Sequence, residues 1–123
     1  ILDDTYNANP ASLEAALRVL AAQSGQRILI LGDMGELGPD TVVYHRQAGI
    51  LAHQLGIDAV YGLGQLAAEA AEAFAAGTEH FMELLPLIDA LQPHLNPETV
   101  VLVKGSRAAH MERVVQALVA GDA

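Results

Sequence analysis

Cysteine, tryptophan and most of the expected positive charge are missing from this sequence. The 123 residues include no Cys and no Trp, and 6 Lys plus Arg stand against 15 Asp plus Glu, which gives a formal net charge of −9. Without cysteine the chain has no disulfide, no thiol nucleophile and no Cys-ligated zinc. A charge this negative repels phosphate backbones and anionic lipid, so we expect neither nucleic-acid binding nor membrane-surface binding through bulk charge.

Long hydrophobic runs and several catalytic motifs are lacking too. No apolar stretch approaches the roughly 20 residues of a membrane span, and no signal-peptide pattern is present, so we expect a soluble, cytoplasmic protein. The sequence has neither G-x-x-x-x-G-K-[ST] nor G-x-S-x-G, which excludes a P-loop and a serine nucleophile elbow of the usual kinds. Its five histidines do not have metal-ligand spacing, so we predict no metal site. With no nucleophile motif and no cysteine, we assign no catalytic residue to the chain.

What the sequence does contain is an alternation of short apolar runs with longer segments of helical period. Apolar residues make up 52% of the chain, enough for one core, so we expect a single domain over residues 1–123. The alternation predicts an α/β fold: a Rossmann-like, doubly wound, mostly parallel sheet with helices on both faces. Strands are expected at 1–4, 27–31, 58–61, 79–82 and 99–103, with helices between them and a final helix that Ser106 would cap and that would bury Met111, Val114, Val115, Leu118 and Val119.

The start of the chain suggests an excised domain. It opens on Ile1 and Leu2 followed by acidic residues, without an initiator Met. We therefore expect a parent protein with further domains, and we take the length as a lower bound on the working protein.

A glycine turn in mid-chain fits a dinucleotide fingerprint. Gly62-Leu63-Gly64 follows an expected strand and opens an expected helix, and Glu83 lies about twenty residues further on. One interpretation is a free-standing dinucleotide-binding module that uses the Gly62–Gly64 turn. The other is an ordinary tight turn between a strand and a helix, because so short a motif arises easily in an Ala-rich sequence.

Two polar clusters flank other expected elements. Lys104-Gly105-Ser106-Arg107 joins the strongest strand to the last helix and includes the only lysine, a combination that binds anions at a helix start or merely caps the helix. The segment 3–10, DDTYNANP, has carboxylates and amides that suit ribose hydroxyls and a purine edge, although Asp, Asn and Pro also cluster at helix starts for local reasons.

Three motifs in order resemble one branch of a known family. DDTYNANP at 3–10, LGDMGELG at 31–38 followed by YHRQAG at 44–49, and VLVKGSR at 101–107 resemble the C-terminal domain of Mur ligases, in particular the branch that adds D-alanyl-D-alanine to UDP-N-acetylmuramoyl-tripeptide. The resemblance covers essentially the whole chain. The NANP and KGSR elements separate it from the other Mur ligases and from folylpolyglutamate synthetases.

The resemblance implies one domain of a three-domain, ATP-dependent amide ligase of bacterial peptidoglycan synthesis. The other two would be an N-terminal domain for the UDP-linked substrate and a central P-loop ATPase domain, which would hold most of the Mg²⁺ contacts. The domain alone is expected to be inactive. By the same resemblance, Asp4, Asn7 and Asn9 would contact the ribose and base of ATP, with Tyr6 near its phosphates.

The glycine loop and the KGSR segment would line the entry of the dipeptide. The resemblance implies that Lys104 and Arg107, with Ser106 between them, meet the terminal carboxylate of D-alanyl-D-alanine. Asp33 or Glu36 would orient its ammonium group. Lys104 and Arg107 would then form a conspicuous cationic pair on an otherwise anionic surface.

Overall fold

The chain folds into alternating strands and helices. The structure, a computed structural model, describes residues 2–4, 10–35, 38–74, 78–105 and 109–121. The strands are β1 (Leu2–Asp4), β2 (Gln26–Gly32), β3 (Ala59–Leu63), β4 (Thr78–Phe81) and β5 (Thr99–Lys104). The helices are α1 (Pro10–Ala21), α2 (Thr41–Gln54), α3 (Ala67–Phe74), α4 (Leu84–Leu91) and α5 (Glu112–Gly121), with short 3-10 turns at Gly38–Asp40 and Gln92–His94.

The strands form one parallel sheet in the order β1-β5-β2-β3-β4. The central strands β2 and β5 come from the continuous apolar runs RILIL and TVVLV, and both are buried toward their carboxyl ends. Such runs suit a parallel strand that is covered on both faces. The expected α/β architecture and the expected strands are therefore confirmed, with shifts of one or two residues at their ends.

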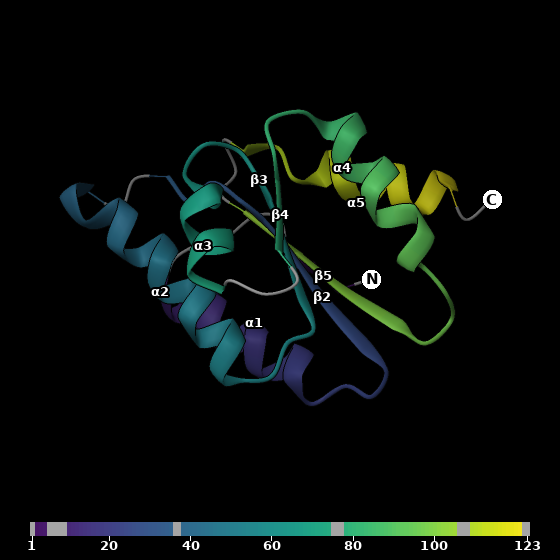
Figure 1. The fold of residues 1–123 in the computed structure, drawn as a ribbon, viewed down its shortest axis with the longest axis horizontal. Coiled ribbons are helices and arrows are strands. Elements are labelled where there is room, and N and C mark those ends of the chain that lie inside the picture. Colours follow the sequence, from purple (N-terminus) through teal and green to yellow (C-terminus); the bar gives the residue numbers. More distant parts are fainter. Residues whose placement is uncertain (1, 5–9, 36–37, 75–77, 106–108, 122–123) are drawn as a thin grey trace.

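Helices cover both faces of the sheet, as a doubly wound fold requires (Figure 1). On one face, α1, α2 and α3 pack on Leu29 and Leu31 of β2. On the other face, α4 and α5 pack on Ile28 and Ile30 of the same strand. Successive side chains of β2 therefore belong to two separate cores, because they point to opposite faces of the sheet.

The strand order reverses between β2 and β5. The chain leaves β2 toward α2 on one face and leaves β5 toward α5 on the other, which is the arrangement at which open α/β sheets bind ligands. The buried side chain of Met111 packs there, and a Cβ on either Gly32 or Gly105 would overlap it. The two glycines therefore let the loops after β2 and β5 close on Met111.

The last helix differs from its prediction. It begins at Glu112, six residues after Ser106, the predicted cap, which lies outside the described residues. Met111, Val114 and Leu118 are buried as predicted and Val115 is partly buried, but Val119 is 58% exposed. Helix α4 ends at Leu91 and is followed directly by the 3-10 turn Gln92–His94.

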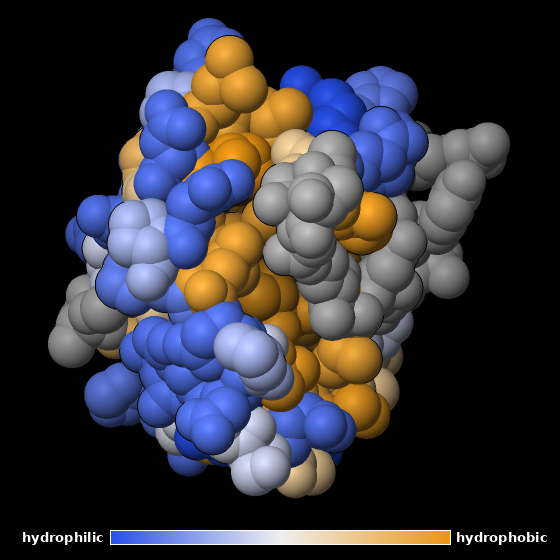
Figure 2. Space-filling view, turned by 90° about the vertical axis from the view of Figure 1, so that its right-hand side faces the viewer, coloured by the Kyte–Doolittle hydropathy of each residue, from blue (hydrophilic) through white to orange (hydrophobic). Residues whose placement is uncertain are grey.

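Some apolar surface remains on the side that carries α4 and α5. Figure 2 shows apolar side chains in a band between hydrophilic borders on this face. Leu85 of α4 is among the large exposed apolar side chains, at 71% exposure.

In the described part of the chain, no helix is both long enough and apolar enough to cross a bilayer.

Candidate functional site at the carboxyl edge of the sheet

The three sequence motifs meet at one edge of the sheet. The segment DDTYNANP begins within β1, the glycine loop follows β2, and the KGSR segment follows β5, and these three strands are neighbours in the order β1-β5-β2. Lys104 at the end of β5 is in register with Asp4 of β1 on one side and with Leu31 of β2 on the other. Segments 100 residues apart in sequence are thus brought to the edge where open α/β sheets bind ligands.

Several of the predicted site residues lie outside the described residues. These are Tyr6, Asn7, Asn9, Glu36, Ser106 and Arg107. The backbone of Asp4 is described as part of β1. The side chains that the structure does describe at this edge are Asp33, Lys104 and their surroundings.

Lys104 is not on the surface. Its side chain is fully buried, with 0% exposure, at the end of the central strand β5. Burying an ammonium group costs several kcal/mol unless polar partners offset it, and Lys104 does have interactions. The expectation of a surface pair of cations is therefore wrong for Lys104, because the continuous apolar run that precedes it places the whole end of β5 in the interior.

Asp33 reaches across the sheet edge to the start of α3. Its Oδ1 accepts a hydrogen bond of 2.8 Å from the backbone N–H of Ala67, the first residue of that helix. A carboxylate at this position satisfies an unpaired helix N–H and complements the positive end of the helix dipole. Asp33 therefore couples the loop after β2 to the turn between β3 and α3.

The same contact argues against a dinucleotide at the glycine turn. A dinucleotide fold places its pyrophosphate at this helix N-terminus, where Asp33 already supplies a negative charge. Both glycines have structural reasons: Gly64 has φ +117° and a Cβ there would come within 2.5 Å of Asp33 Oδ1, while a Cβ on Gly62 would come within 2.9 Å of the Ala67 carbonyl oxygen. The interpretation as a tight strand-to-helix turn is the one that the geometry supports.

His45 fastens the glycine loop to α2. Its buried ring accepts a 2.9 Å hydrogen bond from the Met34 backbone N–H at Nε2, so Nδ1 carries the proton and donates to the Thr41 carbonyl oxygen at 2.7 Å. This arrangement uses both ring nitrogens of a neutral histidine. His45 therefore has a structural role, in which its ring holds the loop after β2 against α2.

Replacing His45 with leucine should lower the free energy of unfolding of the 123-residue chain by about 2 kcal/mol. Leucine fills much of the ring volume but leaves the Met34 N–H buried without an acceptor, a loss that costs about 1–3 kcal/mol. Urea unfolding measures the difference. The matched control is His94→Leu, at an exposed histidine, which should change stability by less than about 0.5 kcal/mol. Equal stabilities for the two variants would contradict the role assigned to His45.

A cavity of about 380 Å³ opens above the loops that follow β2, β3, β4 and β5. Asp33 lines it, together with Arg113 from the first turn of α5. No sequence pattern pointed to Arg113, since residues 111–119 have only the spacing of a helix with a buried face. The available signal was weak: Arg113 is one of the 6 basic residues of an acidic chain.

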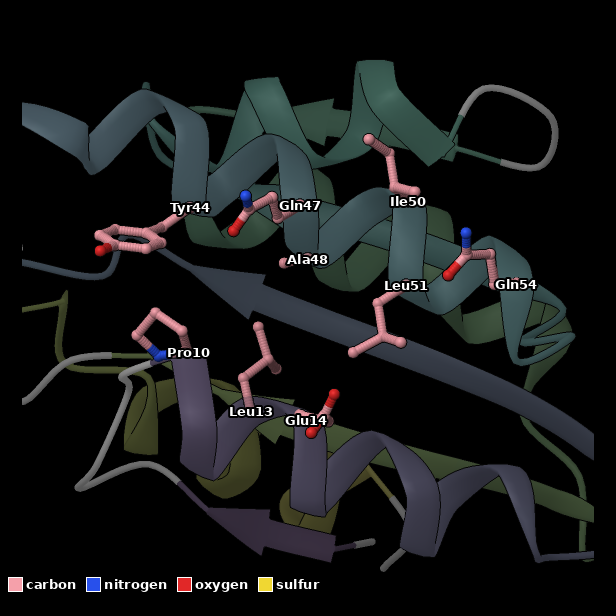
Figure 3. Close-up of a pocket in the computed structure, with 9 residues that line it drawn as sticks. All are labelled: Pro10, Leu13, Glu14, Tyr44, Gln47, Ala48, Ile50, Leu51 and Gln54. Carbon is pink, nitrogen blue, oxygen red and sulfur yellow. The ribbon is translucent and has the colours of Figure 1, made fainter.

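A second cavity, of about 310 Å³, lies between α1 and α2. In Figure 3, Leu13 and Glu14 of α1 face Ala48 and Leu51 of α2, with Tyr44 near the end that Pro10 closes. Its remaining lining residues are Gln47, Ile50 and Gln54. Because Pro10 is the last residue of the DDTYNANP motif, this groove begins next to that motif.

The titratable side chains that the structure describes were compared with the arrangements that hold metal ions. Among residues 2–4, 10–35, 38–74, 78–105 and 109–121, no group of three or more His, Asp or Glu side chains is arranged to hold a metal ion. At the start of α5, a hydrogen bond from the backbone N–H of Glu112, with help from the neighbouring His110 and Arg113, lowers the pKa of the exposed Glu112 carboxyl.

Comparisons with known proteins identify relatives of this chain in sequence and in fold. A family model described as Mur ligase, glutamate ligase domain, matches residues 1–107. The UDP-N-acetylmuramoyl-tripeptide--D-alanyl-D-alanine ligase of Escherichia coli (strain K12) is 44% identical over 120 residues, which cover 96% of this chain and 26% of that protein. The Haemophilus influenzae protein of the same name is 40% identical over 124 residues, with 96% and 27% covered.

Solved structures give the same result. MurF from Acinetobacter baumannii superposes with a TM-score of 0.79 at 38% identity, over 93% of this chain and 26% of that chain. MurF ligase from Thermotoga maritima, crystallised in complex with ADP, superposes with a TM-score of 0.81 at 25% identity, over 91% of this chain and 26% of that chain. The present chain thus spans about a quarter of the length of the proteins that it resembles.

Proposed function

The chain belongs to the Mur ligase family, and from this premise we propose that it works as the C-terminal domain of a UDP-N-acetylmuramoyl-tripeptide:D-alanyl-D-alanine ligase. Such an enzyme uses ATP to convert the peptide carboxylate into an acyl phosphate. The amine of D-alanyl-D-alanine then attacks the acyl carbon, so a C–N bond forms, the C–O bond to phosphate breaks, and the amine loses a proton. This reaction belongs to bacterial peptidoglycan synthesis, and we place it in the cytoplasm.

The observation that carries this proposal is the meeting of three motifs at adjacent strand ends. Motifs that are separate in sequence follow β1, β5 and β2, and the register pairs Asp4, Lys104 and Leu31 side by side. Every loop that follows a strand of a parallel sheet lies at this edge, but these three follow three adjacent strands, at the point where the strand order reverses. Convergence supports a single composite site.

On the β1 side of this edge we assign the ATP contacts. Asp4, Asn7 and Asn9 would bind the ribose and base, with Tyr6 toward the phosphates, as in the family that the motif resembles. Carboxylate and amide groups have the donors and acceptors that ribose hydroxyls and a purine edge require. The phosphates and Mg²⁺ would be held mainly by the P-loop and carboxylates of a central ATPase domain, since no P-loop occurs in this chain.

On the β2 and β5 side we assign the dipeptide contacts. Asp33 or Glu36 of the glycine loop would face its ammonium group, and Ser106 and Arg107 its carboxylate. Lys104, being buried, would act from beneath by holding the ends of β1, β5 and β2 in place. This domain would close over the other two and exclude water, which protects an acyl phosphate from hydrolysis.

In the complete polypeptide that carries this domain, phosphate release from ATP should require both UDP-N-acetylmuramoyl-tripeptide and D-alanyl-D-alanine. The reason is that the acyl phosphate forms only on the first substrate and turns over only when the amine of the second attacks it. A coupled phosphate assay, with each component left out in turn, measures the requirement.

The 123-residue chain alone is the matched control and should release no phosphate, because it has no P-loop. Turnover by the complete polypeptide without any dependence on D-alanyl-D-alanine would overturn the proposal. Turnover with a single amino acid in place of the dipeptide would reassign it to another branch of the family.

A further inference from the structure

The cavity at the carboxyl edge has charged groups of opposite sign in its wall and apolar groups between them. Asp33 and Arg113 line it together with the apolar side chains of Leu63, Leu66 and Met82. Its volume of about 380 Å³ lies within the range of small-molecule sites, roughly 300–1,000 Å³. A ligand that fits this wall carries a positive end, a negative end and small apolar groups.

Asp33 is fixed in position while part of it remains available. Its Oδ1 is held by the Ala67 N–H at 2.8 Å, and Gly64 leaves room for the carboxylate because a Cβ there would lie within 2.5–2.9 Å of three of its atoms. The carboxylate can accept further hydrogen bonds, since each oxygen has two lone pairs. A pre-oriented carboxylate of this kind suits an ammonium group.

Arg113 is likewise held by the backbone around it. Its Nε donates to the His110 carbonyl oxygen at 3.0 Å and Nη2 donates to the Ala109 carbonyl oxygen at 3.5 Å. His110 has φ +53° and is the one non-glycine residue with positive φ in the part of the chain that the structure describes. Such a conformation costs on the order of 1 kcal/mol or more and is found preferentially at functional sites.

Neither Asp33 nor Arg113 forms an ion pair with another described residue. Among the described residues, no carboxylate oxygen lies within 4 Å of the Arg113 guanidinium. The carboxylate of the adjacent Glu112 is directed to His110 instead, at 3.3 Å from Nδ1. Five N–H donors on one guanidinium, of which two are occupied by backbone oxygens, leave donors for a carboxylate of a ligand.

We infer that this cavity binds a small zwitterionic peptide, with Arg113 as the anchor of its terminal carboxylate and Asp33 as the partner of its ammonium group. The inference rests on the proposed function, in which that peptide is the incoming D-alanyl-D-alanine. It makes Arg113 of α5, a residue outside all three sequence motifs, the principal anchor of the terminal carboxylate, beside the Ser106 and Arg107 contacts that the motifs imply. The two methyl groups of the dipeptide would lie against Leu63, Leu66 and Met82.

The test compares two acceptor substrates that differ only in the terminal charge. In the complete polypeptide, kcat/KM is measured for D-alanyl-D-alanine and for D-alanyl-D-alaninamide, which lacks the carboxylate. The wild type should prefer the free acid by about 10- to 100-fold, the usual worth of a charge-assisted hydrogen bond. Arg113→Ala should abolish this preference by losing activity on the acid alone, and Arg113→Lys should restore part of it.

Two further variants separate binding from folding. Asp33→Asn keeps an oxygen acceptor for the Ala67 N–H and removes the charge, so KM should rise for both dipeptides by similar factors while KM for ATP stays constant. Arg18→Ala, at an exposed arginine of α1, should change none of these values. If Arg113→Ala leaves the preference for the acid intact, or lowers activity on acid and amide equally, the inference is overturned although the proposed ligase activity stands. If the wild type shows no turnover that depends on D-alanyl-D-alanine, it is the proposed function that fails.

Discussion

Replacing Gly25 with alanine should lower the free energy of unfolding of the 123-residue chain by about 3 kcal/mol. Gly25 lies at the turn between α1 and β2 with φ +92°, a conformation that costs an L-residue about 1–2 kcal/mol. A Cβ at this position would also overlap the backbone carbonyl oxygen of Glu98. Backbone cannot swing away as a flexible side chain does, so we expect overpacking to add about 1–3 kcal/mol.

The overlap is costly because of where Glu98 lies. Its carbonyl oxygen accepts a 3.2 Å hydrogen bond from the Gln26 N–H, at the beginning of the pairing between β2 and β5. Shifting Glu98 to admit a methyl group therefore disturbs the first contact between the two central strands. These strands carry the glycine loop and the KGSR segment at their other ends.

Gly38→Ala is the matched control for this variant. Gly38 also has positive φ, at +73°, but a Cβ there would meet no atom within 4 Å. Its cost should be about 1 kcal/mol or less, because only the backbone strain remains and the alanine restricts the unfolded chain. Urea unfolding of the two variants isolates the contribution of the overlap, and similar losses for both would contradict it.

The strands and helices were predictable because the spacing of apolar residues within each segment indicates its secondary structure. The apolar run at 27–31 and the run at 99–103 became the two central strands, and the helix that buries Leu13, Leu17 and Leu20 follows from their spacing. The order of the strands cannot be inferred from a local pattern, since it depends on which face of the sheet each helix packs against. The sequence alone could therefore predict the fold class but not that β5 lies between β1 and β2.

Only the site residues that lie within a sequence motif could be predicted. The three motifs follow strands that end at one edge of the sheet. The contact of Asp33 with Ala67 spans 34 residues and has no local signal. Arg113 was missed for a similar reason. The final helix begins later than its cap signal suggested, and the turn at 109–111 brings Arg113 back over the sheet edge. The contact of Asp33 and the position of Arg113 both depend on residues that are distant in the sequence.

Replacing Lys104 with methionine should cost about 3–5 kcal/mol of stability and also reduce ligase turnover by at least about 100-fold. Removing one partner of a buried polar interaction leaves the other without compensation, which is the most expensive way to lose such a contact. Methionine nearly conserves the volume of the lysine stem, so the loss would report on the ammonium group rather than on a cavity.

The expected effect on turnover comes from the position of Lys104 between the two halves of the site. It is in register with Asp4, where the proposed ATP motif begins, and with Leu31, where the glycine loop begins. An error of about 1 Å in the placement of reacting groups can cost 100-fold in rate. Urea unfolding of the 123-residue chain gives the first quantity, and phosphate release by the complete polypeptide, at a temperature where the variant is folded, gives the second.

The distinction between support and direct contact lies in which kinetic constants change. If Lys104 holds the ends of β1, β5 and β2 together, Lys104→Met should lower kcat and weaken the use of ATP and dipeptide together, and it should leave the preference for the free acid over the amide in place. A direct contact with the terminal carboxylate would instead abolish that preference, as proposed for Arg113→Ala. Arg18→Met, at an exposed arginine of α1, is the matched control and should leave stability and turnover unchanged. A Lys104→Met protein that is as stable and as active as the wild type would show that the buried charge serves neither purpose.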